Sequence, residues 1–215
     1  MTQKNYITLA GVIGLIAAFF TGLGEFLLHF DSLGRYAGGY EFMVNISDRR
    51  STIGHYSAVL SAPLYLVGMW HIMKMLEPAN ANASKVGFAI MVYGFVEGIL
   101  WIGSRASISA IVNDAGISDI SNLVNLYELR YENLLQITRL AVLALSIIFT
   151  WLVLTGRSHY PKWVSVFNPI LLILACFALW IIVPTVGNFI MPIALNVSFG
   201  ILFIISIYYS TKINE

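Results

Sequence analysis

Six long apolar runs separated by short polar segments constrain this chain more than any other feature of it. They cover residues 6–30, 53–76, 86–112, 126–155, 163–186 and 189–210. Each run reaches about 20 residues, the length that an α-helix needs to cross the roughly 30 Å hydrocarbon core of a bilayer. The sequence therefore predicts an all-α polytopic membrane protein, with six transmembrane helices in one bundle and a single domain over residues 1–215.

The composition agrees with this class and excludes several others. The chain is 58% hydrophobic and 11% charged, whereas soluble domains carry roughly 25% charged residues. A net charge of +1 gives no reason to expect nucleic acid as a partner. The single cysteine, Cys176, excludes both an intramolecular disulfide and a paired-cysteine metal or redox motif.

The basic residues that flank the runs predict the orientation. Loops on the cytoplasmic side of a membrane protein carry an excess of Lys and Arg. The side of the N-terminus holds Lys4, Lys74, Lys85, Arg157, Lys162 and Lys212, and the opposite loops hold Arg35, Arg49 and Arg50, with Arg130 near an edge. This bias predicts that both termini are cytoplasmic and that the loop of residues 31–52 is external, where its aromatic and glycine content favours a cap.

Polar residues inside the apolar runs are the candidate functional residues, because ionisable groups in hydrocarbon are costly and usually serve a function. Glu25 and His29 lie four residues apart, on one face of a helix. Two further runs carry polar stripes at helical spacing. By depth, we expect these residues to converge in the outer half of the membrane: Glu25, His29, His55, Tyr93, Glu97, Trp101, Arg105, Glu128, Glu132, Gln136, Arg139 and Asn196.

This set predicts roles as follows. Glu25, His29 and His55 would form the catalytic core, with Glu97, Glu128 and Glu132 as acid–base groups. Arg105 and Arg139 would hold an anionic head group, and the other substrate-binding residues would be Tyr93, Trp101, Gln136 and Asn196. Imidazole and carboxylate are also ligands for zinc or iron, so Glu25, His29 and His55 are a candidate metal site. Haem, on His29 and His55, is a further alternative.

Two other features have structural interpretations. Ala10, Gly14 and Ala18 recur every four residues, and small residues on one face allow another helix to approach closely. That helix would be internal, or would belong to a partner or to a second copy in a homo-oligomer. His71 ends the second run beside Trp70 and Lys74, a position typical of an interfacial anchor.

Several short motifs resemble those of an uncharacterised family of six-helix bacterial membrane proteins, a domain of unknown function. They are Gly24 to His29, Gly68-Met69-Trp70-His71, Tyr160-Pro161-Lys162-Trp163, Asn168-Pro169 and Asn196. The resemblance implies six helices and a bacterial inner membrane, and it implies no activity. Ser51 to His55 also resembles the Ser-x3-His of alkaline ceramidases, but no histidine after His159 supplies the second half of that motif.

Four functions are therefore open. The first is a membrane-embedded enzyme, a metal-dependent or acid–base hydrolase or isomerase, that acts on a lipid or other amphiphile in a His/Glu polar cavity in the outer half of the bilayer. The second is a binding or transport protein for a small polar or anionic molecule, which would use the same cavity without bond chemistry. The third is a haem- or metal-binding redox protein, and the fourth is a structural or assembly partner.

Overall fold

In the computed structural model, which describes residues 3–36, 39–114, 116 and 119–213, all regular structure is helical. The long helices are α1 (Gln3–His29), α4 (Ala81–Asn113), α5 (Ile120–Leu154) and α8 (Ala194–Ser210). Shorter ones are α2 (Asp48–Ser61), α3 (Leu64–Leu76), α6 (Pro169–Ile182), α7 (Pro184–Ile190), and the 3-10 turns η1 (Glu41–Met43), η2 (Lys162–Phe167) and η3 (Met191–Ile193).

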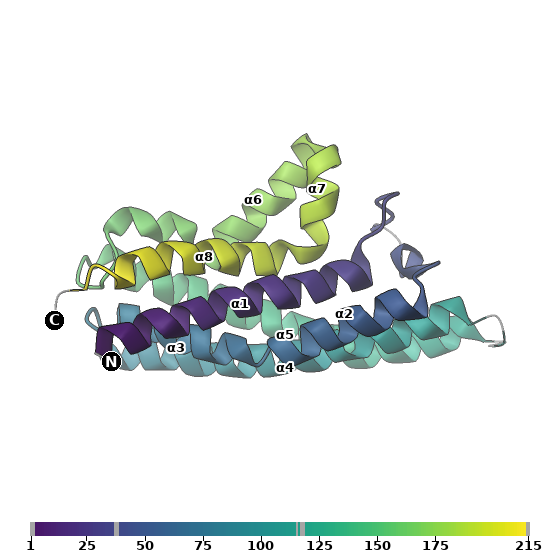
Figure 1. Ribbon diagram of the computed structural model, residues 1–215, viewed down its shortest axis with the longest axis horizontal. Coiled ribbons are helices and arrows are strands. Elements are labelled where there is room, and N and C mark those ends of the chain that lie inside the picture. The colour runs from purple at the N-terminus through teal and green to yellow at the C-terminus, as the bar shows by residue number, and fades with distance from the viewer. Residues whose placement is uncertain (1–2, 37–38, 115, 117–118, 214–215) are drawn as a thin grey trace.

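Five helical stretches are long and apolar enough to cross a membrane. They are Gln3–His29, Asp48–Leu76, Ala81–Asn113, Ile120–Leu154 and Pro184–Ser210. The predicted fifth run, residues 163–186, is not one such helix. It divides into η2 and the fourteen-residue α6, which at about 21 Å is shorter than the hydrocarbon core. These helices support a membrane-embedded protein. The beginning of α1 lies beside the end of α8 (Figure 1), where Thr8 Oγ1 is 2.9 Å from Ser210 Oγ.

The sequence sets most helix boundaries through caps and prolines. Ser47, Asn80, Asp119 and Asn168 each accept a backbone N–H from the first turn of the helix that they precede, which satisfies a donor that has no partner within the helix. Pro63 separates α2 from α3, and Pro184 starts α7 after a break at Val183. The far end of α1 is capped by Arg50, whose Nη2 donates to the Phe30 carbonyl over 2.6 Å.

Glycines allow the helices to approach closely around α1. Gly14 lies against Gly68 of α3 and Phe203 of α8, and Gly24 lies against Gly54 and Ala58 of α2. Ala10 and Ala18 are also buried within the chain. The small-residue face of α1 therefore packs against the protein's own helices, and a role in binding a partner or a second copy stays a prediction.

Two parts of the fold frame one end of the bundle. The pair α4 and α5 extends well beyond the end of α1 (Figure 1), because helices of 33 and 35 residues measure about 50 Å. The segment of residues 39–47, which we call the strap, folds back onto this pair. Met43 and Ile46 of the strap are buried in a cluster with Ile108 of α4, and the Asn113 side chain bonds the backbone at Met43 and Asn45.

Candidate functional site

The last turns of α1 carry a carboxylate that three helices hold in place. The Nδ2 of Asn196, in the first turn of α8, donates to Oε2 of Glu25, and the Tyr65 hydroxyl of α3 donates to Oδ1 of Asn196 over 2.8 Å. Gly22 makes this contact possible, because a Cβ there would lie only 3.0 Å from Cβ of Asn196. The chain of hydrogen bonds fixes the orientation of Glu25.

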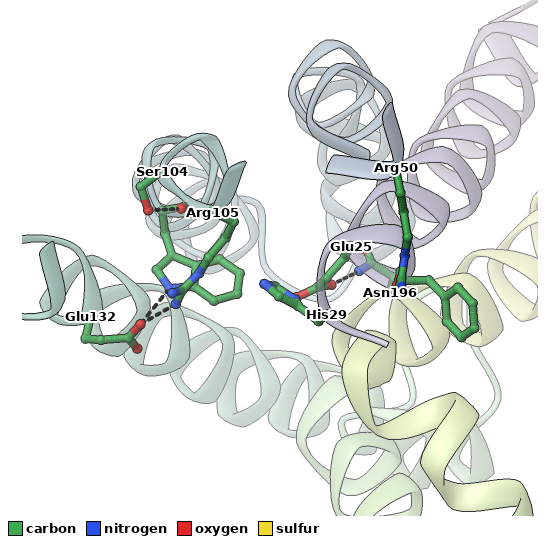
Figure 2. Close-up of polar contacts among 9 residues, drawn as sticks. Glu25, His29, Arg50, Ser104, Arg105, Glu132 and Asn196 are labelled. Atoms are coloured by element: carbon green, nitrogen blue, oxygen red, sulfur yellow. Dashed lines mark hydrogen bonds and ion pairs between the residues drawn. The ribbon is translucent and has the colours of Figure 1, made fainter. Parts of the chain in front are cut away.

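The imidazole of His29 lies next to the Glu25 carboxylate. Its Nδ1 lies 3.8 Å from Oε1 of Glu25, and its ring packs against Trp101 of α4 and Phe42 of the strap. Figure 2 shows the imidazole extending from α1 toward the side where Arg105 lies. Its Nε2 is buried and has no hydrogen-bond partner within the described residues.

A second polar group lies across from His29, between α4 and α5. Arg105 is only 3% exposed and forms an ion pair with Glu132 through Nη2. The Tyr40 hydroxyl of the strap and Nε1 of Trp101 also donate to Glu132, over 3.2 and 3.4 Å. Burial raises the pKa of the Tyr40 phenol, which favours its protonated, hydrogen-donating form at neutral pH.

Two aromatic rings cover the Arg105 guanidinium, and two of its nitrogens lack a hydrogen-bond partner among the described residues. Its central carbon lies 4.3 Å from the centre of the Trp101 ring and 5.5 Å from that of Tyr40, a cation–π arrangement. Among the described residues, its Nε and Nη1 are buried without a partner. A buried donor without a partner costs about 1–3 kcal/mol, and more when it is charged.

The two groups form one candidate site. Trp101 touches both His29 and Arg105, and the strap touches both through Phe42 and Tyr40. An imidazole that faces a fixed carboxylate on one side and has a free nitrogen on the other is arranged to accept or donate a proton. A guanidinium with free donors is arranged to bind an oxyanion.

Several predicted site residues lie away from this arrangement. Tyr93, Glu128, Gln136 and Arg139 are exposed on α4 and α5, so the prediction that both stripes converge as a whole is wrong. Glu97 is partly buried, one turn from Tyr93. His55 packs against its neighbour Tyr56, and within the described part of the chain its buried Nδ1 has no partner. Helical spacing correctly groups residues on a stripe, but the stripe's direction depends on tertiary packing.

The structure does not support the zinc or iron prediction. Within the described residues, no three His, Cys, Asp or Glu side chains lie close enough together to hold a metal ion. Structural and catalytic zinc sites take three or four protein ligands, and Glu25 with His29 supplies only two. The haem alternative on His29 and His55 likewise gains no support.

The prediction that His71 is an interfacial anchor is wrong, because its side chain is fully buried. Its Nδ1 lies 2.7 Å from the Ile7 carbonyl oxygen, and its Nε2 lies 2.5 Å from Oγ of Ser206. Since a carbonyl only accepts, Nδ1 carries the proton and Nε2 accepts from Ser206. The Tyr160 hydroxyl lies 2.5 Å from the same Oγ. These hydrogen bonds link α1, α3 and α8 at the end of the bundle opposite Glu25.

Sequence reasoning missed Tyr65 and Tyr40 as members of the site. Tyr65 belongs to an apolar run, where a single tyrosine is indistinguishable from a packing aromatic. Tyr40 lies in a loop whose path no periodicity predicts. A tyrosine hydroxyl that is buried usually finds a partner, so a tyrosine at the depth of Glu25 and Asn196 was the one available signal.

Comparison with protein-family models matches residues 1–213 to a family of unknown function, DUF6796. No curated protein and no solved structure matches the chain.

Proposed function

The chain belongs to this family of unknown function, and for it we propose a membrane-embedded enzyme that acts on a lipid or other amphiphile by acid–base chemistry. The observation that carries the proposal is the buried Nε2 of His29, which has no partner in the part of the chain that the structure describes, beside a carboxylate that Asn196 and Tyr65 hold in place. A base and a group that orients it are the recurring arrangement of acid–base catalysis.

The position of the site relative to the membrane supports an amphiphilic substrate. From Val86, where the apolar part of α4 begins, Arg105 is nineteen residues away, or about 28 Å. From Ile7, His29 is twenty-two residues away, or about 33 Å. Both values approximate the thickness of the hydrocarbon core. The site would therefore lie at the head-group level of one leaflet, with an acyl chain in the adjacent hydrocarbon.

We propose the orientation and the membrane on separate grounds. The Lys and Arg bias favours cytoplasmic termini, which places the site in the outer leaflet, and the family resemblance favours a bacterial inner membrane. Six crossings, with α6 as a short one, would return the chain to the side where it began. Cysteine labelling from outside the cell tests the orientation: a cysteine at Ser32 should be labelled and one at Ser158 should not.

In a hydrolytic reaction, water would lose a proton to Nε2 of His29 as its oxygen attacks the substrate's ester or phosphoester centre. Glu25 would stabilise the positive imidazolium through its proximity to Nδ1. His29 would then return the proton to the leaving oxygen. In an isomerisation, the same nitrogen would remove and return a proton on the substrate itself.

The proposal is tested by turnover in nanodiscs that contain a bacterial lipid extract. We expect the wild type to convert at least one lipid, and both His29→Gln and Glu25→Gln to reduce the rate by about 100-fold or more, the usual contribution of a general base. His159→Gln is the matched control, because His159 lies in the loop after α5, outside the site. Equal rates in wild type and His29→Gln would refute the proposal.

A binding or transport protein that performs no bond chemistry is the second candidate. The Nε and Nη1 donors of Arg105, which no described residue accepts, favour it, because an anion alone would satisfy them. An intact ligand that co-purifies with the wild type, together with unchanged lipids after long incubation, would favour this candidate over the enzyme.

A further inference from the structure

We infer that Arg105 is the anchor of an oxyanion subsite that takes a phosphate or carboxylate head group beside His29. The inference rests on the proposed function, because it names the chemical class of the substrate at that same site. It is carried by a separate observation: the Arg105 side chain is 4% exposed, and its Nε and Nη1 have no partner among the residues that the structure describes.

The donor count of Arg105 leads to this class of ligand. A guanidinium carries five N–H donors, and Nη2 has two hydrogens, one that pairs with the hydrogen of Nε and one that pairs with a hydrogen of Nη1. Glu132 accepts through Oε1 from Nη2 only, and Nε and Nη1 have no partner within the described residues. One pair of parallel N–H donors therefore remains available, and it matches the two oxygens of a carboxylate or phosphate.

The surroundings of Arg105 restrict how a ligand approaches. The rings of Trp101 and Tyr40 cover the guanidinium, so a ligand must bind in its plane. His29 reaches toward Arg105 from α1 (Figure 2), and within the described residues its buried Nε2 has no hydrogen-bond partner. An oxyanion on the available pair of Arg105 donors would thus hold the adjacent bond of the substrate near the proton-transferring nitrogen.

Glu132 competes with the ligand for Arg105, so the inference predicts in which direction a change at Glu132 alters anion binding. Glu132 is 29% exposed at its side chain and occupies one donor of Arg105 with a negative charge. A second oxyanion would be repelled by that charge. Removing the charge in Glu132→Gln should therefore strengthen anion binding, whereas a purely structural ion pair would lose stability and give no gain in binding.

The experiment measures lipid retained by the full-length protein in nanodiscs of phosphatidylcholine with one-tenth phosphatidate or oleate. We expect the wild type to enrich the anionic lipid by about tenfold or more, Arg105→Gln to abolish the enrichment, and Glu132→Gln to increase it severalfold. Arg130→Gln, an exposed arginine of α5, is the matched control and should retain the wild-type enrichment. Inorganic phosphate at millimolar concentration distinguishes the sources: displacement of the lipid would identify free phosphate as a ligand.

Two results would overturn the inference. One is equal retention of anionic lipid and phosphatidylcholine by the wild type, and the other is a decrease or no change in Glu132→Gln. If Arg105→Gln fails to fold, Glu132→Gln and Arg105→Lys, which should keep part of the enrichment, still decide the question. The proposed function fails separately: anion enrichment that depends on Arg105, with no turnover that depends on His29, would leave this inference standing.

Discussion

Adding a single methyl group at Gly24 should separate α1 from α2 and disturb the residue next to it, Glu25. A Cβ at Gly24 would overlap the backbone nitrogen of Ala58 and lie 2.5 Å from the carbonyl oxygen of Gly54. Both are backbone atoms, so neither can rotate away. Overpacking of this kind costs about 1–3 kcal/mol, whereas alanine gains about 1 kcal/mol over glycine in a helix. Because the contacts are to backbone atoms, the cost should lie in the upper part of that range, about 2–3 kcal/mol, and the net destabilisation should be about 1–2 kcal/mol.

Gly103→Ala is the matched control for Gly24→Ala. A Cβ at Gly103 would lie 3.9 Å from Cγ2 of Val59, an ordinary contact, so only the helical gain of up to about 1 kcal/mol remains. Thermal unfolding in mild detergent should show Gly24→Ala lowered by about 2–8 °C and Gly103→Ala unchanged or raised. Equal midpoints for the two variants would refute the close approach of α1 and α2.

Three further changes have expected outcomes. Hydrogen bonds from Arg35 hold the pKa of the Asp31 carboxyl at about 2, below its ordinary 3.8. The ionised carboxylate therefore stabilises the folded protein by about 1 kcal/mol above about pH 4, and this stabilisation is lost as the pH falls through 2. The melting temperature of the wild type should fall over this range, and that of Asp31→Asn should not show this decline. His71→Leu should cost about 1–3 kcal/mol of unfolding free energy in denaturant titration, because it removes two buried hydrogen bonds, to the Ile7 carbonyl and to Ser206. Tyr160→Phe removes one, to Ser206, and should cost about 1 kcal/mol. Met43→Ala should cost about 2–4 kcal/mol through the cavity that it leaves, and limited proteolysis should then cut the strap faster.

The sequence predicted the class of the protein and part of its site from local patterns. The apolar runs predict the membrane-crossing helices, and the four-residue spacing of Glu25 and His29 predicts that they share a face, as they do. Depth counting predicted that Asn196 would lie near Glu25, and the two are hydrogen-bonded.

The remaining features depend on contacts that no local pattern encodes. Arg139 and Glu132 lie on one stripe of α5, yet only Glu132 meets Arg105, because the extent of each neighbouring helix decides what the stripe faces. His71 looks interfacial by position but is buried, since Gly11 lets its ring approach the Ile7 carbonyl. Pro169 and Pro184 bracket α6 and so limit it to fourteen residues, but the continuous apolar character of residues 163–186 predicted one long helix.

Mass spectrometry of the lipid pool in nanodiscs, before and after incubation with the wild type or with His29→Gln, tests the central claim most directly. The account predicts a new lipid product that accumulates with the wild type and is nearly absent with His29→Gln. Identical lipid pools in the two samples, with both proteins folded, would contradict it.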